Sequence, residues 1–320
     1  MFGITQLDLV LTYKCNMNCG FCLNNYRRKL IGDDKLLDLK FCEEVFDLLK
    51  KEGNQIQSIT IYGGELMLLD PVYLREVFDL CLRYFPGSSL GVISNLVYVD
   101  EKILSIMAEN NVTLSTSYDT MRFQGKSELL KRWVKNMHDF KDMVHSVLIL
   151  SSRYIFEDVR FVKFLYKDRD IPVLLLLFFI PEGLDFKTCE SIRQLILSPS
   201  EYVEAVRFIR NNFCGIRTHT FDGGYMFNNV HILPDDTVGI AGPDYEKGYP
   251  YEKMYKIYPN EEKTITFSLA RLNYIRKQLS ICLPCPYYPE RCYAEYFFEQ
   301  VCFGEKILDR FEKSEQGLSC

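Results

Sequence analysis

The sequence predicts an α/β protein, a partial (β/α)6 TIM-like barrel over residues 1–198 followed by a small α+β domain over residues 199–320. Three observations support this prediction. Six apolar runs alternate with amphipathic stretches, a β-hairpin pattern follows them, and a cysteine cluster lies near the C-terminus. Six strand-then-helix units require parallel strands joined by right-handed crossovers. The active site of such a barrel lies at the carboxyl ends of its strands.

Each predicted strand is an apolar or β-branched run about as long as a buried parallel strand. These runs are Leu7–Tyr13, Ile56–Tyr62, Leu90–Ser94, Val112–Ser117, Val144–Leu150 and Val173–Ile180. Amphipathic patterns predict the helices between them, at Leu37–Lys51, Val72–Tyr84, Glu101–Glu109, Ser127–Phe140 and Phe156–Tyr166. Asp70 and Pro71 give the second helix an N-cap residue and a proline in its first turn.

The pattern changes from about Pro181 onward. Helices are predicted at Ser200–Asn212 and Ile265–Leu279. Between them, two strand patterns flank a Pro-Asp-Asp turn, which is typical of a β-hairpin; the strands are Tyr225–Leu233 and Thr237–Ile240. The last helix leads into the second cysteine cluster, so we expect hairpin and cluster to belong to one small C-terminal domain.

Composition restricts the partners and the compartment. A chain of 320 residues is long enough for a barrel and an appended domain, and its net charge of −5 gives no basic footprint for nucleic acid. The longest apolar run, Val173–Ile180, is far shorter than the ~20 residues of a membrane helix, so no membrane partner is expected. Twelve cysteines behind a start without a secretory signal indicate a reducing cytoplasm.

Cys15, Cys19 and Cys22 form a C-x3-C-x2-C array directly after the first apolar run. Three thiolates on one loop can ligate three irons of a cubic 4Fe–4S cluster. Because no fourth cysteine follows within the loop, one iron would stay open to an exchangeable ligand. A zinc knuckle is an alternative, but it normally has four ligands, and the nearest histidine is His138. A disulfide would need an oxidising compartment.

The array, with the aromatic Phe21 before its last cysteine, resembles the signature of the radical S-adenosylmethionine (SAM) superfamily. The resemblance implies the same partial barrel and a cluster whose open iron chelates SAM. It further implies that the reduced cluster cleaves SAM to methionine and a 5′-deoxyadenosyl radical, which abstracts a hydrogen atom from the substrate. An electron donor such as flavodoxin or ferredoxin is implied as a partner.

Gly63, Gly64 and Glu65 follow the second predicted strand. Glycines at a strand end let the backbone approach a ligand closely. A tight turn with an N-capping carboxylate would explain the same residues. In the context of the cysteine array, however, they resemble the Gly-Gly-Glu motif of the superfamily, which holds the amino group of SAM.

Three further candidates follow the third and fourth strands. Asn95 ends the third strand, although Leu96 stands where relatives often have glycine. Ser117 and Asp119 resemble the Ser-x-Asp edge near the SAM carboxylate and ribose, and side chains two apart on a strand share a face. A solvent-exposed loop is the alternative. The guanidinium of Arg122 suits a carboxylate of SAM or substrate, although a surface role is equally open.

The second cluster contains Cys282, Cys285 and Cys292 in a C-x2-C-x6-C array, with Cys302 beyond it. With its prolines and the preceding hairpin, it resembles the SPASM or twitch domains of the superfamily. One auxiliary 4Fe–4S cluster is expected, because Ile240-Ala241-Gly242 stands where relatives carry a further cysteine. A structural zinc is the alternative. We rank Cys302 first as fourth ligand, then Cys214 and Cys320.

Cys214 lies in the predicted loop before the hairpin and is the candidate catalytic residue. Its thiol could donate a hydrogen atom to a substrate radical, ligate the auxiliary cluster, or have no role. By contrast, Cys42 and Cys81 lie on predicted helix faces, where a buried apolar role is expected.

The resemblance implies an oxidoreductase, and relatives with such C-terminal domains mostly modify peptides or proteins, including ribosomally made peptides. A peptide-modifying radical SAM enzyme is therefore the first prediction. The second is a dehydrogenase or epimerase of a small molecule. A non-catalytic iron–sulfur or zinc scaffold is a third possibility, but it would not need Gly63-Gly64-Glu65 and Ser117-x-Asp119 beside the first cluster.

Overall fold

The computed structural model describes residues 3–167, 171–176, 178, 180–181, 186–197, 199–218, 228–244 and 251–282. Over these residues the strands form one sheet in the order β7-β11-β10-β9-β1-β2-β3-β4-β5-β6-β8. Its central strands β1 to β6 are parallel neighbours in chain order. They are β1 (Gln6–Val10), β2 (Ser58–Tyr62), β3 (Ser89–Ser94), β4 (Thr113–Ser117), β5 (Val144–Leu150) and β6 (Val173–Leu176). The six predicted strands are confirmed, and the first and the last end earlier than predicted, at Val10 and Leu176.

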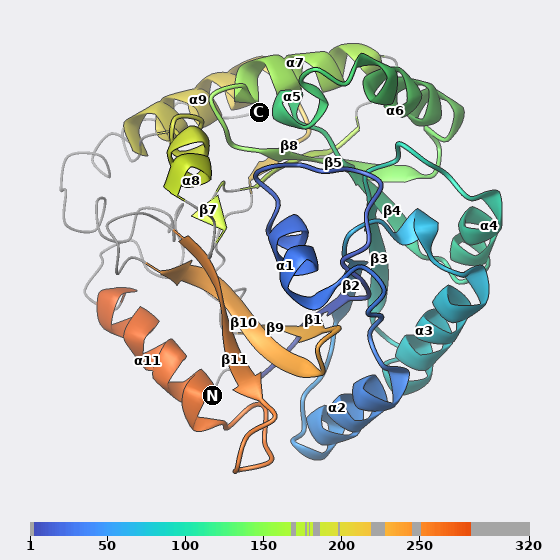
Figure 1. Cartoon of the computed structure of the whole chain (residues 1–320), viewed down its shortest axis with the longest axis vertical. Helices are drawn as coiled ribbons and strands as arrows, with labels where there is room; N and C mark the ends of the chain where they lie inside the picture. The colour runs from blue at the N-terminus through green and yellow to red at the C-terminus, as the bar shows by residue number, and fades with distance from the viewer. Residues whose placement is uncertain are drawn as a thin grey trace.

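Each of the first five strands is joined to the next by a connection that ends in a helix. These helices are α2 (Leu39–Lys51), α3 (Pro71–Tyr84), α4 (Glu101–Glu109), α6 (Ser127–Asp139) and α7 (Ile155–Leu165). In Figure 1 they lie around the outside of the curved sheet. The cap predicted for α3 is confirmed, because the Asp70 carboxylate accepts a hydrogen bond from Val72 N at 2.7 Å and Pro71 opens the helix.

Alternation along the strands separates an apolar outer face from a more polar inner face. Leu7 and Leu9 of β1 belong to the same core as Val45 and Phe46 of α2. Cys42 and Cys81 are buried in this core, as predicted. Each fully buried aliphatic side chain stabilises the fold by about 1.5–3 kcal/mol relative to exposure. The inner face is left for polar and pocket-lining side chains.

Three short elements lie at the carboxyl ends of the strands. They are α1 (Leu23–Ile31), the 3-10 helix η1 (Leu66–Leu68) and α5 (Thr120–Phe123). The sequence analysis did not predict α1, which is a helix of nine residues with no buried residue. In Figure 1, α1 lies in the middle of the view, inside the ring of strands.

The hairpin predicted near residue 235 is confirmed, but it joins the barrel sheet. Its strands are β9 (Asn229–Leu233) and β10 (Thr237–Asp244), followed by β11 (Tyr251–Tyr258). β9 pairs in parallel with β1, so the second edge of β1 is filled by a strand from beyond residue 198. The described part of residues 199–282 thus shares a sheet with the first 198 residues. The division into two domains stays a prediction.

The remaining elements border this sheet. They are β7 (Ile180–Pro181), α8 (Phe186–Arg193), α9 (Pro199–Asn212), β8 (Ile216–Thr218) and α11 (Leu269–Cys282). α9 and α11 correspond to the two helices predicted beyond Pro181. Over the described ranges, no helix combines the length and apolarity needed to cross a bilayer. Cys285, Cys292, Cys302 and Cys320 lie outside the described residues, so the auxiliary cluster stays a prediction.

Candidate active site

A pocket of about 300 Å³ lies at the carboxyl ends of β1 to β5 and brings the predicted site residues together. The cysteine loop lines one side of it, and the ends of β2, β3 and β4 line the others. Of the candidates before residue 123, all except Glu65 line this pocket: Cys15, Cys19, Cys22, Gly63, Gly64, Asn95, Ser117, Asp119 and Arg122. Residues far apart in the sequence therefore meet where the fold predicts an active site.

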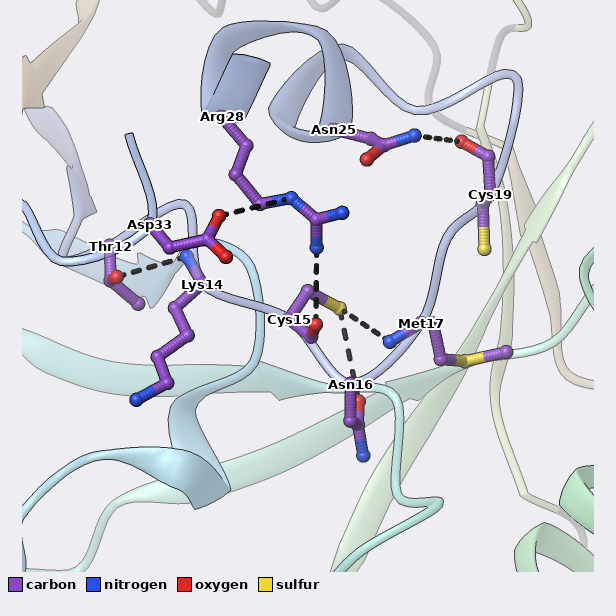
Figure 2. A network of polar contacts seen from close by, with 9 residues as sticks. All are labelled: Thr12, Lys14, Cys15, Asn16, Met17, Cys19, Asn25, Arg28 and Asp33. Carbon is purple, nitrogen blue, oxygen red and sulfur yellow. Dashed lines mark hydrogen bonds and ion pairs between the residues drawn. The ribbon is translucent and has the colours of Figure 1, made fainter. Parts of the chain in front are cut away.

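The cysteine loop is held by hydrogen bonds to its backbone and to one sulfur (Figure 2). Arg28 Nη1 donates to Cys15 O at 3.2 Å, and Asn25 Nδ2 donates to Cys19 O at 3.3 Å. Met17 N donates to Cys15 Sγ at 3.3 Å. Burial raises the pKa of the Cys15 thiol to about 11 and also raises that of Cys19. A metal that binds these sulfurs must therefore displace their protons.

The donor set of this loop fits an iron–sulfur cluster. Cys15, Cys19 and Cys22 are free thiols that line one pocket, and thiolates are the usual ligands of such clusters. The positive charge of Arg122 counteracts the burial that raises the pKa of Cys19. Among the described residues, no group of three or more Cys, His, Asp or Glu side chains is placed so that it could hold a single metal ion. The guanidinium of Arg122 beside the sulfurs would offset the negative charge of three thiolates.

Gly63 and Gly64 let the end of β2 pack directly on the cysteine loop. Gly64 N donates to Thr12 O at 2.7 Å, and Glu65 N donates to Lys14 O at 2.8 Å. A Cβ atom on Gly63 would overlap Thr12 O, and one on Gly64 would overlap Lys14 O. The sequence predicted these glycines for close approach of a ligand. The structure adds a different requirement, which is close approach of the backbone of the cysteine loop.

Glu65 is buried and does not line the pocket. Its side chain caps η1 through Met67 N at 3.0 Å, so the capping interpretation is supported. It also accepts hydrogen bonds from Ser94 Oγ at 2.7 Å and Asn95 N at 2.8 Å. Burial raises the pKa of Glu65, and these hydrogen bonds partly offset the rise. The carboxylate thus joins the ends of β2 and β3.

Asn95 connects Glu65 to the cysteine loop. Its Nδ2 donates to Asn16 Oδ1 at 2.8 Å and lies 3.8 Å from Cys15 Sγ. The next residue, Leu96, has a φ of 54°, in the left-handed region that favours glycine. That backbone conformation explains why relatives often have glycine here. In this chain the fully buried Leu96 side chain offsets the conformational cost.

The structure shows which protein groups contact Asp119. Ser117 and Asp119 both line the pocket, but the Asp119 carboxylate is already engaged. Its Oδ2 accepts from Arg122 Nη2 at 3.0 Å and its Oδ1 accepts from Leu150 N at 2.9 Å. Because Asp119 is fully buried, alternation alone could not reveal that its partners are protein groups. It orients Arg122, whose guanidinium lies 5.8 Å from the Phe21 ring centroid.

Asp158, which the sequence analysis missed, holds the start of α5. Its Oδ1 accepts hydrogen bonds from Thr120 N at 3.0 Å and from Thr120 Oγ1 at 2.6 Å. The side chain is fully buried, and Oδ2 has no hydrogen-bond partner among the described residues. Burial raises the pKa of Asp158 to about 7.

We expect Asp158→Asn to flatten the pH dependence of stability. Because the pKa of Asp158 is raised by folding, its stabilising contribution is complete below about pH 4 and is lost as pH rises to about 7. The amide cannot ionise, so the variant should lose less stability over this window, by up to roughly 4 kcal/mol. Urea unfolding at pH 4 and pH 8 measures the difference over the whole window. The exposed neighbour Glu157→Gln is the control, and an unchanged pH slope in Asp158→Asn would refute the expectation.

A row of hydrogen-bonded polar side chains from β1, β2 and β9 lies beside the pocket. Tyr62 lines the pocket, and its hydroxyl lies 3.0 Å from His231 Nδ1. His231 Nδ1 lies 3.2 Å from Asp8 Oδ2, which accepts from Asn229 Nδ2 at 2.8 Å. Burial lowers the pKa of His231, although the Asp8 carboxylate partly counteracts this. This row depends on the pairing of β1 with β9, which no local pattern revealed.

Cys214 does not lie at the pocket. Its side chain is exposed, and it precedes β8, which runs parallel to β6. Cys214 therefore lies near the amino end of a parallel strand. The pocket lies at the opposite, carboxyl ends of the strands. The sequence analysis proposed Cys214 as the candidate catalytic residue in the loop before the hairpin, and the structure places this loop away from the pocket. A catalytic role for Cys214 stays a prediction without support from its position.

Part of the chain is similar in sequence to known proteins. Residues 9–166 match the family model described as the radical SAM superfamily. The chain is 25% identical over 144 residues to an S-adenosylmethionine-dependent nucleotide dehydratase of Siniperca chuatsi, which covers 43% of this chain and 39% of that protein. It is 22% identical over 128 residues to a GTP 3′,8-cyclase of Clostridium perfringens, which covers 37% and 36%.

An uncharacterized protein of Methanocaldococcus jannaschii is 25% identical over 152 residues, which covers 47% of this chain and 50% of that protein. The chain thus spans half or less of the length of these curated relatives. Among solved structures, native anSMEcpe with bound AdoMet matches with a TM-score of 0.64 and 14% identity, over 97% of this chain and 95% of that one. The same enzyme with AdoMet and the Cp18Cys peptide gives 0.63 and 13% over the same shares. At these identities the likeness shows the fold alone.

Proposed function

We propose that this protein is a radical SAM enzyme that modifies a peptide, and the match of residues 9–166 to the radical SAM superfamily model supports the enzyme class. The observation that carries the proposal is the pocket in which Cys15, Cys19 and Cys22 meet the ends of β2, β3 and β4. A peptide is favoured because the fold match extends over 97% of the chain to anSMEcpe, whose structure holds a peptide. The curated nucleotide enzymes match only part of the chain.

Cys15, Cys19 and Cys22 would hold a 4Fe–4S cluster that also binds SAM. If bound, this cluster would supply the electron for reductive cleavage of SAM, with a donor such as flavodoxin or ferredoxin. Met17 N donates to Cys15 Sγ, and Asn95 Nδ2 lies within 3.8 Å of it. Such donors stabilise negative charge on sulfur and shift a cluster toward its reduced form.

The chain's own residues also orient and shield the reactants. Asp119 fixes Arg122 beside Cys19 and Cys22, where the guanidinium offsets thiolate charge or binds a carboxylate. Glu65 fixes Asn95 by holding the ends of β2 and β3 together. An apolar wall of Leu148, Leu150 and Leu176 lines the pocket next to these charges. Apolar walls exclude water from a site in which a reactive radical would form.

The alternative is a dehydrogenase or epimerase of a small molecule, and the relatives that act on nucleotides support it. An auxiliary 4Fe–4S cluster held by Cys282, Cys285, Cys292 and Cys302 belongs to the proposal as well. Cys282 ends α11, and the other three cysteines lie outside the described residues.

The test is whether the anaerobically reconstituted, reduced protein converts SAM to equal amounts of 5′-deoxyadenosine and methionine. We expect both products by liquid chromatography and mass spectrometry. A candidate peptide, chosen from a short gene beside this one and deuterated at its side chains, should transfer deuterium to 5′-deoxyadenosine. If SAM is not cleaved, the proposed function is refuted and a non-catalytic iron–sulfur or zinc scaffold is the remaining interpretation. SAM cleavage with deuterium transfer only from a nucleotide or another small molecule would favour the alternative.

A further inference from the structure

Arg27 is a pocket-lining cation on α1, and its position is well fixed. Asn24, one turn earlier on α1, donates from Nδ2 to Gly63 O at 2.7 Å, which ties the helix to the end of β2. Arg27 lines the same pocket as the cysteines and is half-buried. Its Nη1 donates to the hydroxyl of the fully buried Tyr13 at 3.4 Å. The guanidinium therefore lies over the β1 and β2 side of the pocket.

Arg27 differs from the other two guanidiniums near the cysteine loop. Arg28 pairs with Asp33 at 3.2 Å, and Arg122 pairs with Asp119 at 3.0 Å. Arg27 contacts a neutral phenol, and it forms no ion pair with a carboxylate in the described part of the chain. A partly desolvated guanidinium without an anion is costly, because burial of charge is favourable only when the charge is paired. Its planar fork binds a carboxylate or phosphate through two parallel hydrogen bonds.

Asp8, a buried acid on β1, already has protein partners. Its Oδ2 accepts a hydrogen bond from Asn229 and lies 3.2 Å from His231 Nδ1. Burial lowers the pKa of His231, the Asp8 carboxylate counteracts this, and the charge of Arg27 lowers it further. In the β9–β10 turn, Asp235 accepts from Thr237 Oγ1 at 2.7 Å. These groups leave the Arg27 charge available to a ligand.

We propose that Arg27 binds a carboxylate or phosphate group of the substrate. This inference rests on the proposed function and adds the substrate class to it: a molecule with an anionic group near the position that reacts. For a peptide, that group is an acidic side chain, a phosphorylated side chain or the C-terminal carboxylate. Arg122 and Arg27 lie over different strand ends, after β4 and over β1 and β2 respectively, so one pocket offers separate cations to two anionic ligands.

SAM itself carries a carboxylate, so the test must separate two sources of the same chemistry. The full-length, cluster-loaded protein is heated with and without inorganic phosphate at constant ionic strength, both free of SAM and saturated with SAM. A ligand that binds only the folded state raises the unfolding midpoint. Phosphate also stabilises proteins generally by exclusion from their surface, so the rise in Arg27→Gln gives the background.

In the SAM-saturated protein, we expect the phosphate-induced rise to be at most half as large in Arg27→Gln as in the wild type. Lys29→Gln, an exposed cation on the same helix, should keep the full rise. Arg27→Lys should give an intermediate value, because an ammonium group cannot form the bidentate pair. It also serves as the test variant if Arg27→Gln does not fold.

Two outcomes would overturn the inference. Equal rises in wild type and in Arg27→Gln would show that Arg27 does not bind an anion. A rise that depends on Arg27 without SAM and disappears when SAM is saturating would show that Arg27 binds the SAM carboxylate. Failure of the wild type to form 5′-deoxyadenosine is a separate result. It would refute the proposed function and leave the phosphate site standing.

Discussion

Replacing Cys15, Cys19 and Cys22 together by alanine should reduce 5′-deoxyadenosine formation to the level of a protein-free control. These three thiols are the cysteines that line the pocket among the described residues, and no other thiol there can replace them. Without thiolate ligands the loop cannot hold iron, because carbon side chains offer no ligand atom. The reaction is measured anaerobically with excess SAM and reductant.

The matched control is Cys81→Ala, which removes a buried thiol of the α3 core far from the pocket. It should keep SAM cleavage within about twofold, at a stability cost of about 1 kcal/mol for a small buried side chain. Iron and sulfide content should fall in the triple variant by one cluster. Any iron that remains would be a measure of the predicted C-terminal cluster. Continued SAM cleavage by the triple variant would refute the proposed function.

Gly64→Ala should have the second-largest effect, on stability and activity together. The new Cβ would overlap the carbonyl group of Lys14, which cannot move without shifting the cysteine loop. Forced overpacking typically costs about 1–3 kcal/mol, and contact with backbone places this case at the upper end. Since misplacement of a reacting group by ~1 Å can lower a rate ~100-fold, SAM cleavage should fall by at least that factor.

The control for this substitution is Gly87→Ala, because a Cβ at Gly87 would meet no atom within 4 Å. Urea unfolding and SAM cleavage are measured for both variants, with cluster content determined first. If Gly64→Ala retains wild-type stability and cleavage within about twofold, the close packing of the β2 end on the cysteine loop is not required. Loss of SAM binding with unchanged stability would favour the ligand-approach interpretation of this glycine.

The sequence predicted most of the barrel because the central strands are apolar or β-branched runs and each outer helix has a buried stripe. It did not predict α1, a nine-residue helix with no buried residue. Chain order also could not show at which end of the strands Cys214 lies, because that depends on the direction of β8.

Motif spacing located the site residues, but it did not reveal what their side chains contact. Glu65 and Asp119 occur where the family pattern predicts ligand-binding groups, yet both carboxylates are buried against protein donors. Asp158 and the Asp8–His231 pair had no local pattern, because each depends on contacts between distant segments. Such partners follow from tertiary packing, which the periodicity of a single strand or helix does not contain.

The pairing of β1 with β9 has a consequence for how the chain is made. The register places Asp8 of β1 opposite His231 of β9, so one edge of β1 stays unpaired until a strand more than 200 residues later in the chain has been synthesised. Contacts between such distant segments slow folding, because a long loop must close before they form. Until then β1 has an open edge, which is prone to pair with other chains. A ribosome-bound or truncated form without β9 is therefore the species of this protein most in need of a chaperone.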